Sequence, residues 1–177
     1  AANRLPLPVI YPMVRGRLTG INERVATSED FVDSRTKRLI EREFNLSYME
    51  ALPGHNSVVA GRWFDRGAGL EGGLSVEEGI ARSFNVNIGD RLTFSVAGKS
   101  FTAPITSLRK LDWDSMQVNF FVISPIRVLE PFPTSFITAT ATLEKLAEQS
   151  PERFAKLKAA VQNESAEICG GSYLERE

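Results

Sequence analysis

The chain has 177 residues, of which 42% are hydrophobic and 24% are charged, a composition that suits a buried core and a solvated surface. Its net charge is −1 at pH 7 and its pI is about 6.0, so no basic field attracts nucleic acid or an anionic membrane. No run reaches the roughly 18 to 20 apolar residues of a membrane span. The start AANRLPLP carries no targeting pattern, and the single cysteine, Cys169, cannot form an internal disulfide.

The first third of the chain predicts two strands on either side of a short helix. Residues 9–21 are rich in β-branched and aromatic side chains and predict a strand, in which Pro12 belongs at the edge or start. Residues 28–46 are highly charged and predict a short, solvated helix. Valines at 58–59 predict a buried strand that a glycine turn follows. The apolar side of the helix would consist of Leu39, Ile40 and Phe44.

The middle of the chain predicts a helix that precedes a β-hairpin. Ser75 and Glu78 have the spacing of a capping box, so a helix is expected to begin there and to stop at Asn85. Its apolar face would consist of Val76, Ile80 and Phe84. Two runs that alternate apolar and polar residues come next, at 92–96 and 101–105. Because the connection between them, Ala97-Gly98-Lys99, contains glycine, the two runs predict a hairpin.

The last third predicts two more strands and a terminal helix. Residues 118–123, which include Phe120, are apolar on both faces and predict a central, buried strand. Residues 135–143 predict another strand, and Ser150 with Pro151 opens a helix. Residues 166–177 have no pattern and predict a loose tail. Strands and helices in this mixed order indicate an α+β fold with a helix-capped small β unit in its middle.

Two glycine-containing stretches resemble nucleotide-binding motifs. The stretch GAGLEGG at residues 67–73 fits G-x-G-x-x-G, but the helix after it is a marginal crossover and no acidic residue ends the following strand. The stretch VAGKS ends like a phosphate-binding loop, yet Thr93 stands where that motif needs glycine. We therefore expect a surface connector at 67–73, a hairpin turn at 98–100, and no nucleotide cofactor at either place.

Candidate catalytic and metal-binding residues are few. A Ser/His/Asp or Cys/His site would have to use the single histidine, His55, which lies in a Pro/Gly turn. One histidine and one cysteine do not make a metal cluster, and Asp112 and Asp114 would need further oxygen ligands to hold a cation. We expect instead that Trp113 is buried and that Arg109, Asp112 and Asp114 satisfy polar groups around it. These residues, with Phe120 and the helix face, are predicted to be structural.

Several segments together resemble the periplasmic domain of YbbP-like ABC-transporter permeases of the MacB/FtsX superfamily. The resemblance rests on YPMVRGRLTGIN, SVEEGIA, GDRLTF and SLRK-DWDS-QVNFFV, and it extends in order over about residues 8–141. In that superfamily a small, β-rich Sabre-like part is inserted into a Porter-like part made of strand-helix-strand units. The resemblance implies a Porter-like part at residues 5–60 and 132–165 and a Sabre-like insert at 61–131.

The resemblance also implies a function. Such permeases lie in the bacterial inner membrane, work with a separate ATPase subunit and project a large domain into the periplasm. The residues here would then be an excised ectodomain that transmits ATPase-driven movement to a lipid, lipoprotein or peptide cargo, without catalytic residues of its own. Two alternatives remain from the residues themselves: a free-standing periplasmic module that binds a peptide or lipid, and a hydrolase that uses His55.

Overall fold

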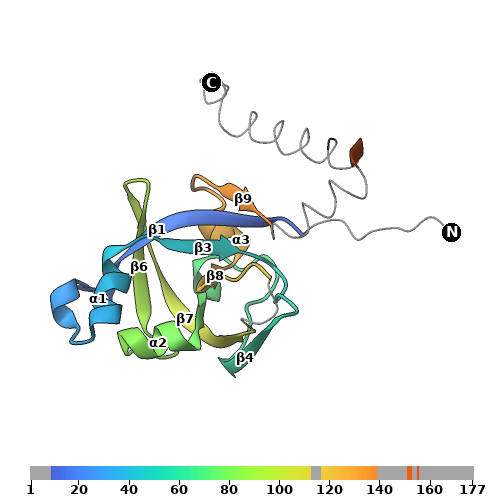
Figure 1. The fold of residues 1–177 in the computed structure, drawn as a ribbon. Helices are drawn as coiled ribbons and strands as arrows, with labels where there is room; N and C mark the ends of the chain where they lie inside the picture. The colour runs from blue at the N-terminus through green and yellow to red at the C-terminus, as the bar shows by residue number, and fades with distance from the viewer. Residues whose placement is uncertain (1–8, 113–116, 139–150, 153–154, 156–177) are drawn as a thin grey trace, which may run out of the picture. The chain divides into compact units, whose positions relative to one another are not determined.

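The computed structural model of the chain describes residues 9–112, 117–138, 151–152 and 155. It has a mixed α+β fold in which Tyr11–Ile137 form one compact unit, as Figure 1 shows. In the second unit, Ala1–Ile10 with Thr138–Glu177, the described residues of 151–155 are helical. The elements of the first unit are β1 (Tyr11–Ile21), β2 (Arg24–Val25), the 3-10 helix η1 (Ser28–Asp30), α1 (Ser34–Glu41), β3 (Phe44–Tyr48), β4 (Asn56–Gly61), the 3-10 helix η2 (Leu70–Gly72), β5 (Leu74–Glu77), α2 (Glu78–Phe84), β6 (Arg91–Val96), β7 (Lys99–Leu111), β8 (Val122–Ser124), α3 (Ile126–Leu129) and β9 (Ser135–Ile137).

The sheet closes on itself. Its strands pair in the order β1, β3, β8, β5, β7 and β6, and β6 pairs again with β1. The pairs β3–β8 and β5–β7 are parallel, and the other pairs of the ring are antiparallel. Three strands add to this ring from outside: β2 and β9 pair with β1, and β4 pairs with β7. The 11-residue strand β1 therefore takes part in most of the architecture.

The interior of the closed sheet is the hydrophobic core. Buried and less buried residues alternate along β6 and β7, so one face of each strand points inward. Phe44 lies edge-to-face against the rings of Phe84 and Phe94, with centroid distances of 6.0 and 6.3 Å. The side chains with at most 2% exposure include Val14, Leu46, Leu74, Val76, Phe94, Ala103, Ile105 and Val122. Burial of this many large apolar groups is the main stabilising contribution to the fold.

The predicted hairpin is confirmed, with a shorter turn. Strands β6 and β7 pair from Val96↔Lys99 to Arg91↔Pro104, so that only Ala97 and Gly98 connect them. Both turn residues have positive φ, 47° for Ala97 and 80° for Gly98. Two successive residues in the left-handed region are typical of the tight turns that match the twist of paired strands. Lys99 therefore belongs to the strand and not to the connection.

The predicted helix exists, but it begins later and has a different cap. Ser75 and Val76 lie in β5, so the prediction that they begin a helix and contribute to its face is wrong. The physical reason is that Ser75 is needed in the sheet, where its buried hydroxyl accepts hydrogen bonds from Ser107 and Arg109. Glu77 caps α2 instead, since its carboxylate accepts from the backbone N–H groups of Gly79 and Ile80 at 2.8 and 2.7 Å. The rest of the prediction is confirmed: Ile80 and Phe84 are buried, and Asn85 ends the helix with a φ of 51°.

Other corrections concern the ends and edges of elements. Phe44 lies in β3 and not on the apolar side of α1, which Leu39 and Ile40 provide. Val59 is 49% exposed because β4 lies at an edge of the sheet, so the prediction of a buried strand there is wrong. The predicted central strand begins only at β8, although Phe120 before it is buried, with 2% exposure. The sequence patterns also missed β2, β3 and α3, which have two, five and four residues.

The predicted division into residues 5–60 with 132–165 and residues 61–131 stays a prediction, but strands pair across it. The pairs β1–β6 and β3–β8 join the two sides of residue 60 within one closed sheet. The predicted strand at 135–143 is present at β9, which ends at Ile137, and Thr138 is not in a strand. Residues 139–143, most of the predicted terminal helix and the predicted loose tail lie outside the described residues. Among the described residues, no helix has the length and apolar character that crossing a membrane requires.

Candidate functional site

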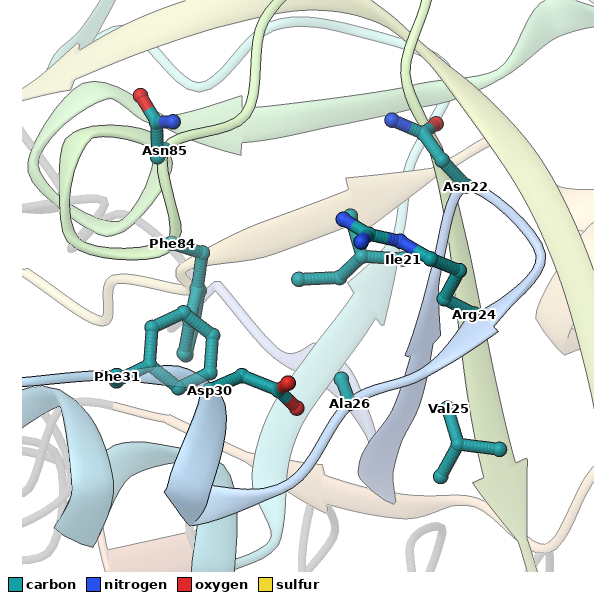
Figure 2. A pocket seen from close by; sticks show the side chains of 9 residues that line it. All are labelled: Ile21, Asn22, Arg24, Val25, Ala26, Asp30, Phe31, Phe84 and Asn85. Atoms are coloured by element: carbon teal, nitrogen blue, oxygen red, sulfur yellow. The ribbon is translucent and has the colours of Figure 1, made fainter.

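A pocket of about 390 Å³ lies beside the β1–β2 hairpin, at the end of β1 that is remote from β9. We call it the tip pocket. It is lined by Ile21, Asn22, Arg24, Val25, Ala26, Asp30, Phe31, Phe84 and Asn85. Figure 2 shows Phe31 and Phe84 on one side of it and Ile21 and Arg24 on the other, with the Asp30 carboxylate between them. Three separate segments of the chain thus supply its walls.

The hairpin that forms one wall is held by a tight turn and by hydrogen bonds to β6. Asn22 and Glu23 connect β1 to β2 with φ values of 49° and 67°. Asn22 is well suited to this conformation, because its short polar side chain tolerates the left-handed region. Its side-chain amide donates to Asp90 Oδ1 at 2.8 Å and accepts from the Arg91 backbone N–H at 2.8 Å. The tip of the hairpin is therefore fixed to the start of β6.

The wall that carries Asp30 is held by a capping box. The Asp30 carboxylate oxygen Oδ2 accepts from the backbone N–H of Thr27 at 2.7 Å and from the Thr27 hydroxyl at 3.0 Å. These two hydrogen bonds, with a smaller contribution from the charge of Arg24, hold the pKa of Asp30 below its ordinary value. Asp30 is therefore ionised at neutral pH, and its position beside the pocket is fixed by its own helix.

The aromatic wall comes from the loop after η1 and from the end of α2. Phe31 lies edge-to-face against Phe84, with ring centroids 5.4 Å apart. Phe84 is buried and also contacts Phe44 of the core, so this wall is continuous with the interior. Asn85 follows at the end of the helix, where its left-handed backbone turns the chain toward β6.

The tip pocket combines two opposite charges with an apolar wall. Arg24 is exposed and forms no ion pair with any residue that the structure describes, although its charge lowers the pKa of Asp30. The described part of the chain contains no group of three or more potential metal ligands, here or elsewhere. The pocket can thus offer a cation, an anion and aromatic surface to a ligand.

A different kind of site surrounds Arg109, one of the residues predicted to be structural. Arg109 lies on β7 and is fully buried. Its guanidinium donates to the hydroxyl of Ser75 at 2.9 Å, to the side-chain oxygen of Asn56, and to the carbonyl of Phe120 at 3.0 Å. We call Arg109 with these three partners the Arg109 cluster. It joins β4, β5 and β7 to the chain segment that leads into β8.

Burial lowers the pKa of Arg109 to about 10, and the nearby charge of Glu77 opposes this effect. The guanidinium therefore remains charged at neutral pH and is satisfied by hydrogen bonds to neutral acceptors. Trp113 and Asp114 lie outside the described residues, so the predicted burial of Trp113 stays a prediction. Asp112 is exposed, whereas Phe120 supplies a carbonyl to Arg109, a role that its apolar side chain did not indicate.

Two of the glycines in residues 67–73, Gly72 and Gly73, have structural reasons to be glycine. Gly73 has a φ of 71°, and a Cβ at this position would lie 2.5 Å from the carbonyl oxygen of Pro104. A Cβ on Gly72 would lie 2.5 Å from that of Ala68. The segment leads through the short η2 into strand β5, not from a strand into a long helix. This context agrees with a connector; the absence of nucleotide binding stays a prediction.

His55 lies just before β4, beside a pocket of about 580 Å³ that also includes Ser57 and Asp112. Its Nε2 lies 3.0 Å from the carbonyl oxygen of Val118, so this nitrogen donates a hydrogen bond. A nitrogen that carries a proton in this way cannot accept one from a serine hydroxyl. The geometry therefore gives no support to a hydrolase that uses this nitrogen of His55 as its base.

The sequence did not predict the tip pocket. The Thr27–Asp30 spacing of its capping box was present in the sequence and could have located η1. However, the pocket exists only because the closed sheet brings residues 21–31 next to residues 84–85. Neither segment has a motif that indicates the other.

Sequence comparison identifies a known protein that is similar to most of this chain. No model of a known protein family matches it. Over 129 residues, 73% of the chain, its sequence is 38% identical to the uncharacterised ABC transporter permease YbbP of Escherichia coli (strain K12), and the match spans 15% of that permease's length. A solved domain of a protein from Porphyromonas gingivalis, provisionally named a permease, has a TM-score of 0.43 and 12% identity over 87% of the chain and 72% of that domain. The predicted resemblance to YbbP-like ABC-transporter permeases is confirmed, and the chain is a homologue of a segment of such a permease.

Proposed function

We propose that this chain is a periplasmic domain of an inner-membrane ABC-transporter permease and that it transmits ATPase-driven movement to a periplasmic cargo. The observation that carries the proposal is the 38% identity to YbbP over 73% of the chain. The chain spans about 15% of the length of that permease, so the membrane part and the ATPase contact would belong to other segments of the whole protein. The cargo would be a lipid, a lipoprotein or a peptide.

The way in which the compact unit begins and ends supports a mechanical role. The first residue of β1, Tyr11, pairs directly with the last residue of β9, Ile137. The chain therefore enters and leaves this unit through two adjacent antiparallel strands. A displacement of these two strands would be passed to the whole closed sheet, because β1 pairs with four other strands.

The same strand pair suggests where an inserted part would begin and end. Residues 11–137 form one compact unit, so we propose that the Sabre-like insert extends over this range. The Porter-like part would then consist of segments on either side of it. This division is an alternative to the boundaries at 60 and 132, and it keeps every strand of the closed sheet in one part.

We propose that the domain itself has no catalytic activity and that a separate ATPase subunit supplies the energy. The Arg109 cluster uses its polar groups to join strands, and His55 Nε2 is engaged with a carbonyl, so both contribute to structure in the described part of the chain. A cargo contact would need an exposed surface, and the tip pocket provides one at the opposite end of β1 from Tyr11.

Membrane topology tests the location. In the full-length permease with its native cysteines replaced, the exposed turn residue Glu23 would be changed to cysteine. A thiol reagent that does not cross the inner membrane should label Glu23→Cys in cells whose outer membrane is permeabilised, without lysis. A cysteine in a cytoplasmic loop of the same permease serves as the control. Labelling of Glu23→Cys only after lysis would contradict the proposal, as would failure of the permease to copurify with an ATPase subunit.

A further inference from the structure

The tip pocket holds two opposite charges that do not neutralise each other by contact. Asp30 is fixed by its two hydrogen bonds to Thr27, and Arg24 has no ion-pair partner among the described residues. An ion pair between exposed side chains usually adds little to stability. The free protein therefore loses little stability when Arg24 and Asp30 do not form one. It leaves each charge able to meet an opposite charge of a ligand.

Apolar surface lies beside these charges. Ile21, Phe31 and Phe84 line the pocket itself. Val25, which also lines it, is 77% exposed. A single exposed valine is ordinary, but this one belongs to the lining of an aromatic pocket and adds to its apolar contact area.

The walls of the pocket are held in place before any ligand arrives. Asn22 is bonded to Asp90 and to the Arg91 backbone, and Phe84 packs into the core. A preformed site loses less conformational entropy on binding, so even a modest contact area can give measurable affinity. Arg24 is exposed and has no ion-pair partner among the described residues, so its long side chain can adjust to the ligand.

We propose that the tip pocket binds a short peptide segment of a partner protein that carries an apolar, an acidic and a basic side chain close together in its sequence. The apolar side chain would contact Phe31 and Phe84, the acidic residue Arg24, and the basic residue Asp30. Successive residues of a peptide can carry an apolar group and two opposite charges on separate side chains. A zwitterionic lipid instead carries both charges on one headgroup, and an anionic lipid matches Arg24 but brings a like charge near Asp30.

This inference does not depend on the proposed transport function. It rests on the lining of the pocket alone, and it can be tested with the 177-residue chain in solution. The probes are acetylated and amidated pentapeptides with lysine, leucine and glutamate at the centre, in both orders. Two control peptides replace either the leucine or both charged residues with serine. Vesicles of phosphatidylethanolamine and phosphatidylglycerol form a separate arm.

The readout is the shift of backbone amide resonances during titration with each probe. We expect saturable shifts at residues 21–31 and 84–85 with a charged leucine peptide, and binding weaker by about tenfold or more for both control peptides and for Arg24→Glu. Arg17→Glu, which changes an exposed arginine of β1 outside the pocket, should bind as the unchanged chain does. Arg24→Gln provides a second, milder variant if the charge reversal perturbs the fold.

Three results would overturn the proposal. The first is the absence of saturable shifts with either order of the charged peptide. The second is an equal loss of affinity in Arg17→Glu and Arg24→Glu, which would indicate a general charge effect. The third is binding of the vesicles without binding of the peptides, which would make the tip pocket a lipid site. A permease that failed the topology test while its domain bound the peptide would refute only the transport function.

Discussion

Two arginines of this domain show opposite uses of the same side chain. Arg109 is fully buried, and its guanidinium is surrounded by hydrogen-bond acceptors from three parts of the chain. Arg24 is exposed on a two-residue strand and forms no ion pair with a described residue. A buried charge is tolerated only when its polar atoms are satisfied, so Arg109 must be part of the fold. Arg24 has no such requirement, so its charge remains available to a ligand.

The largest expected effect comes from the side chain of Phe120, whose backbone carbonyl belongs to the Arg109 cluster. Phe120 is 2% exposed, packs with Met13, Phe64 and Ile123, and lies 6.1 Å from the ring of Tyr11. Phe120→Ser should lower the free energy of unfolding by about 3 to 5 kcal/mol, since it leaves a cavity in this cluster. Urea unfolding measures the change. A loss below roughly 1 kcal/mol would mean that the packing relaxes and that the segment before β8 contributes little to stability.

A direct contrast of the two arginines should give the next largest effect. Arg109→Met leaves the carbonyl of Phe120 and the side chains of Ser75 and Asn56 without their donor, and we expect a loss of about 2 to 4 kcal/mol. Arg24→Met should change stability by less than about 0.5 kcal/mol, as surface substitutions usually do. Urea unfolding of both variants tests the comparison. Equal losses in the two variants would remove the distinction between a structural and a free arginine.

The cap of α2 should give an effect of intermediate size. Glu77→Ala removes the carboxylate that accepts from two backbone N–H groups, and the free energy of unfolding should fall by about 1 to 2 kcal/mol. Glu78→Ala is the matched control, because Glu78 only forms a surface pair with Arg82 at 2.9 Å, and it should cost about 0.3 to 0.5 kcal/mol. If Glu78→Ala had the larger effect, the capping role would belong to the residue that the sequence pattern indicated.

The smallest effect concerns the ionisation of Asp30 in the tip pocket. Its pKa is lowered in the folded state, so its contribution to stability is present above the unfolded pKa, about 3.9, and is lost as the pH falls through the folded value. NMR titration of the carboxyl should show a midpoint below that reference. Thr27→Val should raise the pKa part of the way back, because the backbone hydrogen bond remains. An unchanged midpoint in Thr27→Val would show that the Thr27 hydroxyl does not matter.

Local sequence patterns predicted the elements whose structure depends on residues close together in the chain. The alternation along residues 92–105 and the apolar spacing of Ile80 and Phe84 were sufficient to place a hairpin and a helix. The same patterns wrongly assigned Ser75 and Val76 to a helix, because the residue spacing of a capping box can also occur in a buried strand. Whether Ser75 caps a helix or binds Arg109 is decided 34 residues away in the chain.

The candidate sites depend on contacts that no local pattern contains. Arg109 was singled out as structural, but its partners Ser75 and Asn56 come from strands that pair with β7 only in the folded sheet. The tip pocket requires β1 to return beside β6 and to bring Phe31 against Phe84. These contacts follow from the order in which the strands pair, and no periodicity in the sequence indicates that order.

Removal of the compact unit from the full-length permease tests the central claim most directly. Because Tyr11 and Ile137 lie opposite each other in paired strands, a short Gly/Ser linker can replace residues 11–137 without separating the flanking segments. We expect the shortened permease still to insert into the membrane and to associate with its ATPase, but no longer to restore the phenotype of cells that lack the permease. Full restoration by the shortened permease would refute transmission through this domain, because movement would then reach the cargo without it.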